Sequence, residues 1–312
     1  MGAGSLRGLI ALALLALPAA PVRAQQVADT TFDTRVARPA YTGDGPRLLF
    51  DEAHHEFHRV DGRYRPFADL ARHDGYRVVA NPDTFSAATL AKGELLVIAN
   101  ALGDDDMSAP AASNRAFTPR ECAAVAAWVR GGGALLLIAD HAPMGDAARA
   151  LAETLGVDMR AAYTADPERN DGGGPTILHY RPGKGLHDTH PIVVGRDSSE
   201  RVRHVVAFTG QSLSGPTGAV SLLTLSTAAE DLLIRLGESA RDVPPGKRRP
   251  AGGRSQGLAF ALGSGRVVVL GEAAMLTAQV AGPQAFKMGM NAPGNDDRQF
   301  GLNVLHWLTR AL

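Results

Sequence analysis

The sequence predicts an α/β fold built on a mainly parallel sheet, and two observations support this prediction. Near-continuous apolar runs recur along the chain, as expected for central parallel strands that are covered on both faces. Segments compatible with helices separate these runs, and alternation of strands and helices is typical of a parallel sheet. The runs are Leu48–Phe50, Leu95–Ile98, Leu135–Ile138 and Val267–Leu270. We expect them to be neighbouring strands.

Local signals mark the elements between the runs. The helix with the clearest signals follows Thr118, because Thr118 and Glu121 match a capping box with Pro119 at the first helical position. The glycines that begin at Gly131 end that helix. The remaining expected elements are helices over 62–74, 147–155 and 295–312 and strands over 76–79, 221–225 and 257–262.

The N-terminal residues predict an exported protein. Arg7 precedes an apolar run over 9–17 that is too short to span a bilayer core about 30 Å thick. Val22 and Ala24 provide small residues at the positions that precede a signal-peptidase cut. We therefore expect residues 1–24 to be a signal peptide that is cleaved after Ala24. The mature chain is expected to be periplasmic or extracellular and to lack a membrane span.

The mature chain is expected to form one folded domain. Residues 25–46 are polar and rich in turn residues, which predicts a leader before a single α/β domain over 47–312. Residues 158–217 break the alternation and are rich in Gly, Pro, Asp and His. Their β-like runs are short and cover 176–180, 192–194 and 202–208. We interpret this stretch as an insertion of hairpins and loops packed beside the functional site.

Composition and context exclude several classes of function. The 32 Lys and Arg residues only balance the 32 Asp and Glu residues, whereas a nucleic-acid binder needs excess positive charge. The single cysteine, Cys122, excludes an intramolecular disulfide and a Cys-rich zinc site, and its place early in a helix predicts a buried, inert thiol. Gly253–Gly257 matches GxSxG but lacks the preceding strand and following helix that a serine nucleophile elbow requires.

Titratable residues follow strands that are otherwise apolar. Asp51 ends the first run, Asp140 and His141 follow the third, and Glu272 follows the last. The carboxyl ends of parallel strands lie at one edge of a sheet, where ligands bind in such folds. We therefore predict one pocket at this edge. The residues expected to line it are Asp51, His54, His55, Asp140, His141 and Glu272, and the candidate catalytic residues are Asp51, His55, Asp140, His141 and Glu272.

A cluster of histidines follows the first run. Asp51 is expected to cap a helix that begins there, which would place His54 and His58 four residues apart on one face. Paired histidines near carboxylates can hold Zn²⁺ or another divalent metal ion, and His54 and His58 are the candidate ligands. Imidazole beside carboxylate also suits general acid/base catalysis. The alternative is that Asp51 is only a helix cap and that the histidines line a solvated turn.

Two parts of the chain resemble known families. The stretch from Thr118 to His141 resembles the nucleophile-bearing region of the class I glutamine amidotransferase-like superfamily, especially trehalose-utilisation-type members that have lost the cysteine. The tail resembles the auxiliary domain of uncharacterised ABC-transport proteins and a related uncharacterised bacterial family of secreted proteins. The residues that carry this second resemblance are Gly265–Glu272, Asn295, Phe300, Asn303, Trp307 and Leu308.

The resemblance implies a flavodoxin-like three-layer sandwich. It does not imply glutaminase activity, because His141 stands where the superfamily has its catalytic cysteine. We therefore expect a secreted protein that binds a small polar ligand, with carbohydrate as one candidate, or a divalent metal at the strand ends, with hydrolysis as the enzymatic version. The alternative is a non-catalytic interaction module of a cell-envelope or transport assembly, which would have a protein partner.

Overall fold

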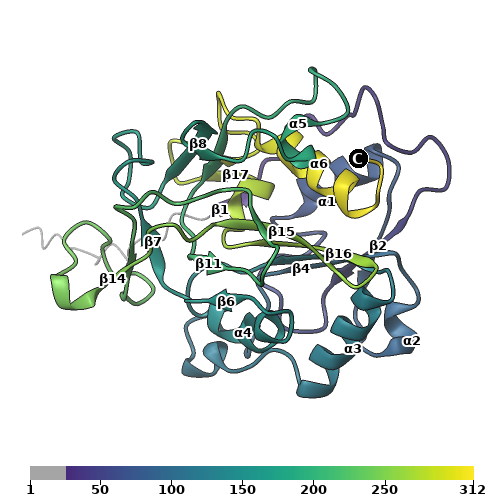
Figure 1. The fold of residues 1–312 in the computed structure, drawn as a ribbon, viewed down its shortest axis with the longest axis horizontal. Helices are drawn as coiled ribbons and strands as arrows, with labels where there is room; N and C mark the ends of the chain where they lie inside the picture. The colour runs from purple at the N-terminus through teal and green to yellow at the C-terminus, as the bar shows by residue number, and fades with distance from the viewer. Residues whose placement is uncertain (1–25) are drawn as a thin grey trace, which may run out of the picture.

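A seven-stranded sheet forms the centre of the molecule (Figure 1). The computed structural model describes residues 26–312, so the expected signal peptide lies outside the described residues. From one edge to the other the strands are β12 (Val220–Ser221), β15 (Gly257–Leu262), β16 (Gly265–Leu270), β5 (Ala134–Ile138), β4 (Leu95–Ala99), β2 (Arg47–Asp51) and β3 (Arg77–Asn81). The strands from β16 to β3 run parallel, and β15 and β12 extend the sheet antiparallel.

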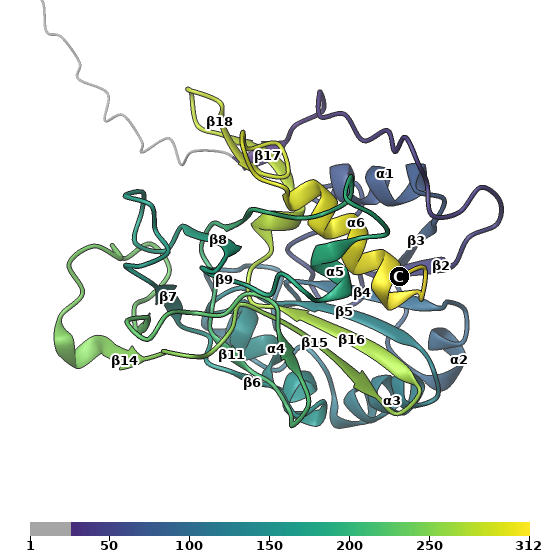
Figure 2. The same ribbon diagram turned by 45° about the horizontal axis from the view of Figure 1, so that its top comes forward.

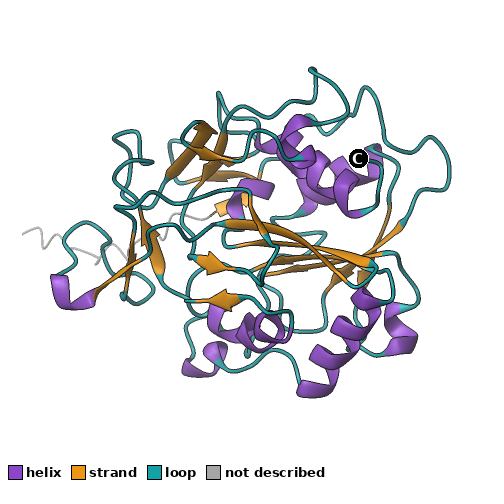
Figure 3. Cartoon of the chain, viewed as in Figure 1, coloured by secondary structure: helices purple, strands orange, loops and turns teal. Residues whose placement is uncertain are grey.

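Helices cover both faces of this sheet (Figure 3). On one side lie α1 (Arg65–His73), α5 (Pro191–Val194) and α6 (Asp297–Leu308), and on the other lie α2 (Ala87–Leu90), α3 (Pro119–Arg130) and α4 (Met144–Thr154). Alternate residues of each strand enter opposite cores, as β5 shows: Leu136 packs on the α6 side and Leu137 on the α3 side. The expected α/β architecture with neighbouring parallel central strands is therefore confirmed.

Smaller sheets surround the central one. They are β1 (Gln26–Ala28) with β17 (Ala278–Ala281) and β18 (Phe286–Gly289); β10 (Val205–Ala207) with β8 (Leu178–Pro182) and β9 (Gly185–Leu186); β11 (Leu213–Ser214) with β6 (Asp158–Met159); and β14 (Arg248–Pro250) with β13 (Glu230–Leu232) and β7 (Tyr163–Ala165). Short 3₁₀ turns are η1 (Pro110–Ser113), η2 (Pro245–Lys247) and η3 (Ala274–Leu276). Residues of the expected leader and insertion thus pair with segments distant in sequence.

Two local expectations were wrong. Residues 192–194, expected to be β-like, belong to the short helix α5, where Pro191 follows a capping His190. No helix follows Asp51, because the backbone there bonds across to the end of β4 instead of along itself. Phe57 N donates to Asn100 O, and Leu102 N donates to His54 O, both at 3.0 Å.

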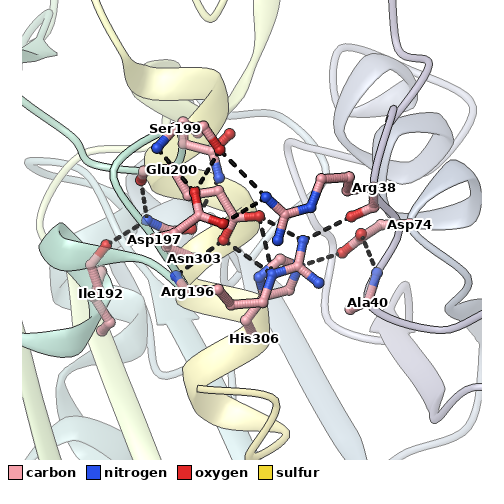
Figure 4. Close-up of polar contacts among 11 residues, drawn as sticks. Arg38, Ala40, Asp74, Ile192, Arg196, Asp197, Ser199, Glu200, Asn303 and His306 are labelled. Carbon is pink, nitrogen blue, oxygen red and sulfur yellow. Dashed lines mark hydrogen bonds and ion pairs between the residues drawn. The ribbon is translucent and has the colours of Figure 1, made fainter.

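A polar network ties the leader and the insertion to α6 (Figure 4). Asp74 accepts from Ala40 N at 2.8 Å and contacts Nε2 of the buried His306 at 2.6 Å. Asn303, one of the residues that carry the family resemblance, donates to Ile192 O at 2.8 Å and to Glu200 O at 2.9 Å. These buried contacts give the tail residues a structural role. Among the described residues, the helices are too short or too polar to cross a membrane.

Candidate functional site

The predicted strand-end residues divide into two separate groups. Asp51 and His54 join Glu56 and Glu121 in a buried set that we call the His54 cluster. Asp140, His141 and Glu272 line a cavity of about 320 Å³ that we call the His141 cavity. Asp51, His54 and His55 are not part of that cavity lining, so the prediction of a single shared pocket was wrong.

Both nitrogens of His54 are used inside the protein. Nδ1 lies 2.8 Å from Asp51 Oδ2, and Nε2 lies 2.8 Å from Glu121 Oε1. The ring is also enclosed by aromatic side chains, with centroids of Phe85 and Phe117 each 4.7 Å away. Because every polar atom of this imidazole already faces a partner, the cluster is arranged to hold three segments of the chain together.

The third carboxyl of the cluster completes the network with its own proton. Burial raises the pKa of Glu56 to about 9, and the neighbouring Asp51 raises it further in the same direction. Burial also raises the pKa of Asp51, to about 7. Glu56 Oε2 accepts from His54 N, whereas Oε1 has no acceptor-type contact of its own. We conclude that Glu56 is protonated at neutral pH and donates to Asp51.

Among residues 26–312, Asp51, His54 and Glu56 are also the set whose ligand atoms lie near enough together, within 4.8 Å, to surround a metal ion. His58 is not in this set. It is buried against Tyr64, with ring centroids 4.7 Å apart, and burial lowers its pKa to about 3. The pairing of His54 and His58 on one helix face was therefore wrong. His55 is half exposed and contacts the exposed Asp105 at 2.6 Å, outside both groups.

The His141 cavity lies at the carboxyl ends of β5 and β16, where the sequence placed it. Polar groups occupy its floor, and its walls are mostly apolar. The lining residues are Gln26, Phe57, Met107, Asp140, His141, Met144, Tyr163, Phe208, Thr209, Leu236, Glu272, Ala274 and Met288. Apolar walls with a few convergent polar groups are typical of small-ligand sites.

Asp140 is held rigidly at the end of β5. Asn100, at the end of β4, contacts it twice: Asn100 Nδ2 donates to Asp140 Oδ2 at 2.8 Å, and Asp140 N donates to Asn100 Oδ1 at 2.9 Å. Ala273 N donates to the other oxygen, Oδ1, at 2.5 Å. Burial nevertheless raises the pKa of Asp140 to about 7. The side chain is therefore fixed in position while its charge state changes near neutral pH.

Glu272 is held by backbone in the same way. Ala274 N donates to Oε1 at 2.7 Å, and Met275 N donates to Oε2 at 2.8 Å. Burial raises the pKa of Glu272 well above its ordinary value, and the charge of Asp140 adds to the effect. Two carboxyls in one buried site cannot both ionise cheaply, so the pair retains a proton at neutral pH.

His141 presents a free nitrogen at this cavity. Nδ1 donates to Ala142 O at 2.7 Å, so Nε2 carries the lone pair. No hydrogen bond to Nε2 is found in the described part of the chain. The ring stacks on Tyr163, with centroids 3.7 Å apart and planes 14° from parallel. Burial lowers the pKa of His141 to about 4, so the imidazole is neutral at physiological pH. The cavity thus combines a neutral base with proton-retaining carboxyls.

Sequence reasoning missed several residues that shape the site. Tyr163 lies in the irregular insertion, where no periodic pattern indicates its stack on His141. Gln211 braces the same turn, because its Nε2 donates to Ala139 O and Asp140 O at 2.9 Å. Glu121 was recognised only as a capping residue, and the structure confirms that role beside its contact with His54. Cys122 and Ser255 are buried, as their sequence context predicted.

Comparisons with known proteins support the fold and leave the activity open. No protein-family model matches the chain, and no curated protein matches it in sequence. The N-terminal domain of mmIFT52 matches with a TM-score of 0.57 at 15% identity, covering 84% of this chain and 97% of that one. A thuA-like protein from Bacteroides uniformis matches with a TM-score of 0.44 at 12% identity, covering 88% and 93%. A GMP synthase protein from Thermoplasma acidophilum gives 0.39 at 11%, covering 85% and 92%.

Proposed function

We propose that this is a secreted protein that binds a small polar ligand, of the carbohydrate class, in the His141 cavity. The observation that carries the proposal is the cavity itself, in which a neutral His141 and the carboxyls of Asp140 and Glu272 face apolar walls. A sugar ring matches this lining because its hydroxyl groups both donate and accept hydrogen bonds, whereas its C–H face packs on aromatic and aliphatic side chains.

The protonation states favour a neutral ligand. The lone pair of His141 Nε2 accepts from a hydroxyl, and the proton retained by the Asp140–Glu272 pair donates to a second oxygen. A fully ionised ligand would add charge to a buried site that already suppresses it. The carboxyl pair and His141 also supply an acid and a base, so hydrolysis of the bound ligand is the enzymatic version of the proposal.

We further propose a flavodoxin-like three-layer sandwich and membership of the class I glutamine amidotransferase-like superfamily without its catalytic cysteine. The strand–turn–helix at His141 and the strand order support this assignment. Cys122 lies on α3 and is absent from the cavity lining, which argues against glutaminase chemistry. A divalent metal in the His54 cluster is the second candidate, but its ion would have to replace the contacts that Asp51 and Glu121 make with His54.

Titration calorimetry on the mature chain with neutral mono- and disaccharides, amino sugars and small amides tests the proposal. We expect saturable binding of a neutral sugar that His141→Ala and Glu272→Gln each weaken at least tenfold. His187→Ala, at an exposed histidine outside the cavity, is the matched control. Binding that the cavity variants leave unchanged, or none by any compound, contradicts it. Turnover of a glycoside by the wild type but not by His141→Ala selects the hydrolase, whereas binding without turnover selects a non-catalytic module.

A further inference from the structure

A projecting segment beside the cavity has a composition unlike the rest of the surface. Residues 233–249, which we call the arm, connect β13 to β14 and stand away from the body in both views (Figures 1 and 2). Leu233 is 50% exposed and Leu236 is 44% exposed. Large apolar side chains at the tip of a projecting loop are costly in water, which indicates that the arm meets another surface.

The arm is also basic. It carries five basic and two acidic residues, in a chain whose 32 basic and 32 acidic residues otherwise balance. These residues are Arg235, Arg241, Lys247, Arg248 and Arg249, against Glu238 and Asp242. Lys247 pairs with Glu238, and Arg248 pairs with Glu230. Within residues 26–312, the guanidinium groups of Arg235, Arg241 and Arg249 have no carboxylate within ion-pair distance.

We propose that the arm docks the protein on an anionic lipid bilayer. Exposed leucines beside unpaired arginines match the two components of such a surface, because leucine side chains enter the acyl boundary while arginines contact lipid phosphates. A soluble acidic partner would use the arginines but would leave Leu233 and Leu236 in water. The combination of exposed leucines and arginines therefore favours a lipid surface over a free polyanion.

The arm is coupled mechanically to the cavity. Leu236 lines the cavity directly. Tyr163, which stacks on His141, packs with Leu232 and Val243 in the small apolar cluster that supports the arm. On the other side of the cavity, Met288 of β18 contributes to the lining, and Phe286 two residues earlier is 54% exposed. A protein docked through the arm would therefore hold its cavity close to the lipid headgroups.

Vesicle sedimentation tests this proposal with the mature chain. We expect the chain to sediment with phosphatidylglycerol-containing vesicles, to be released by high salt, and to remain largely free with pure phosphatidylcholine. The Arg235→Gln, Arg241→Gln, Arg249→Gln triple variant should weaken partitioning by roughly fivefold for each charge removed. The Leu233→Ser, Leu236→Ser double variant should weaken it independently of salt.

Val79→Ser with Arg120→Gln, at an exposed valine of β3 and an exposed arginine of α3, is the matched control and should bind as the wild type does. The proposal is overturned by no sedimentation with anionic vesicles, by equal loss in the control, or by binding to soluble polyglutamate without binding to vesicles. Sugar binding is measured separately, so failure of the proposed ligand function does not alter this outcome.

Discussion

Two histidines that follow parallel strands of the same sheet meet opposite fates. His54, after β2, has both nitrogens bonded to carboxylates and its ring enclosed by Phe85 and Phe117. His141, after β5, has one nitrogen bonded to its neighbour's carbonyl and the other free at a cavity. The difference teaches that a strand-end position is insufficient to make a functional histidine. What distinguishes the two is whether the fold has already used the ring's hydrogen-bonding capacity.

The largest expected effect breaks the His54 cluster. His54→Ala should lower the unfolding free energy by about 3 kcal/mol, because it leaves buried carboxyls of Asp51 and Glu121 without their partner. Urea unfolding followed by circular dichroism measures the change. His55→Asn, at the half-exposed neighbouring position, should stay within about 0.5 kcal/mol of the wild type. Equal effects of the two substitutions would mean that the cluster does not stabilise the fold.

A second effect appears in the pH dependence of the His141 cavity. The folded-state pKa of Asp140 is raised from 3.8 to about 7, so its protonated form favours the folded state below pH 4 and this contribution is lost as the pH rises to 7. His141 acts with opposite sign, because its lowered folded pKa of about 4 makes stability rise between pH 4 and 6.5.

Asp140→Asn separates these opposing contributions. Relative to the wild type, the variant should gain stability as the pH rises from 4 to 7, by at most about 1.4 kcal/mol per pH unit. Urea unfolding at a series of pH values measures the difference, and the slope is read in place of the absolute stability because the new amide also faces donors. Parallel pH profiles for the two proteins would show that Asp140 ionises normally.

The third prediction sharpens the contrast between the histidines. His141→Ala should cost about 1 kcal/mol of unfolding free energy, less than His54→Ala, because no buried carboxylate loses a partner. Ligand affinity should nevertheless fall roughly tenfold or more, as one hydrogen bond to Nε2 is lost. Calorimetry and urea unfolding on the same preparation give both numbers. A large loss of stability with intact binding would reverse the roles assigned to the two histidines.

The smallest expected effect concerns metal ions. Adding Zn²⁺, Mn²⁺ or chelator should shift the melting temperature of the wild type by less than about 1 °C, because His54 already has both nitrogens bonded within the cluster. Differential scanning fluorimetry checks this. A larger stabilisation by one ion that Glu56→Gln abolishes would instead establish Asp51, His54 and Glu56 as a metal site.

The sequence by itself determined the central sheet. Runs such as Leu95–Ile98 and Leu135–Ile138 are apolar at every position, and only a strand covered on both faces buries such a run. The helix that starts after Thr118 was equally determined, since its cap, Pro119 and Gly131 lie within the chain segment itself. The placement of Asp140, His141 and Glu272 together also followed, because parallel strands end at one edge.

Only the tertiary structure decided how the strand-end residues are used. After β2 the backbone turns to bond with the end of β4, which replaces the expected helix and directs His54 toward Glu121 on α3, 67 residues away. Tyr163 reaches His141 from an insertion without regular pattern. Such contacts depend on loops whose hydrogen bonds are made across the fold, so no local periodicity records them. The sequence therefore located the edge at which ligands bind, and long-range packing selected which histidine remained free there.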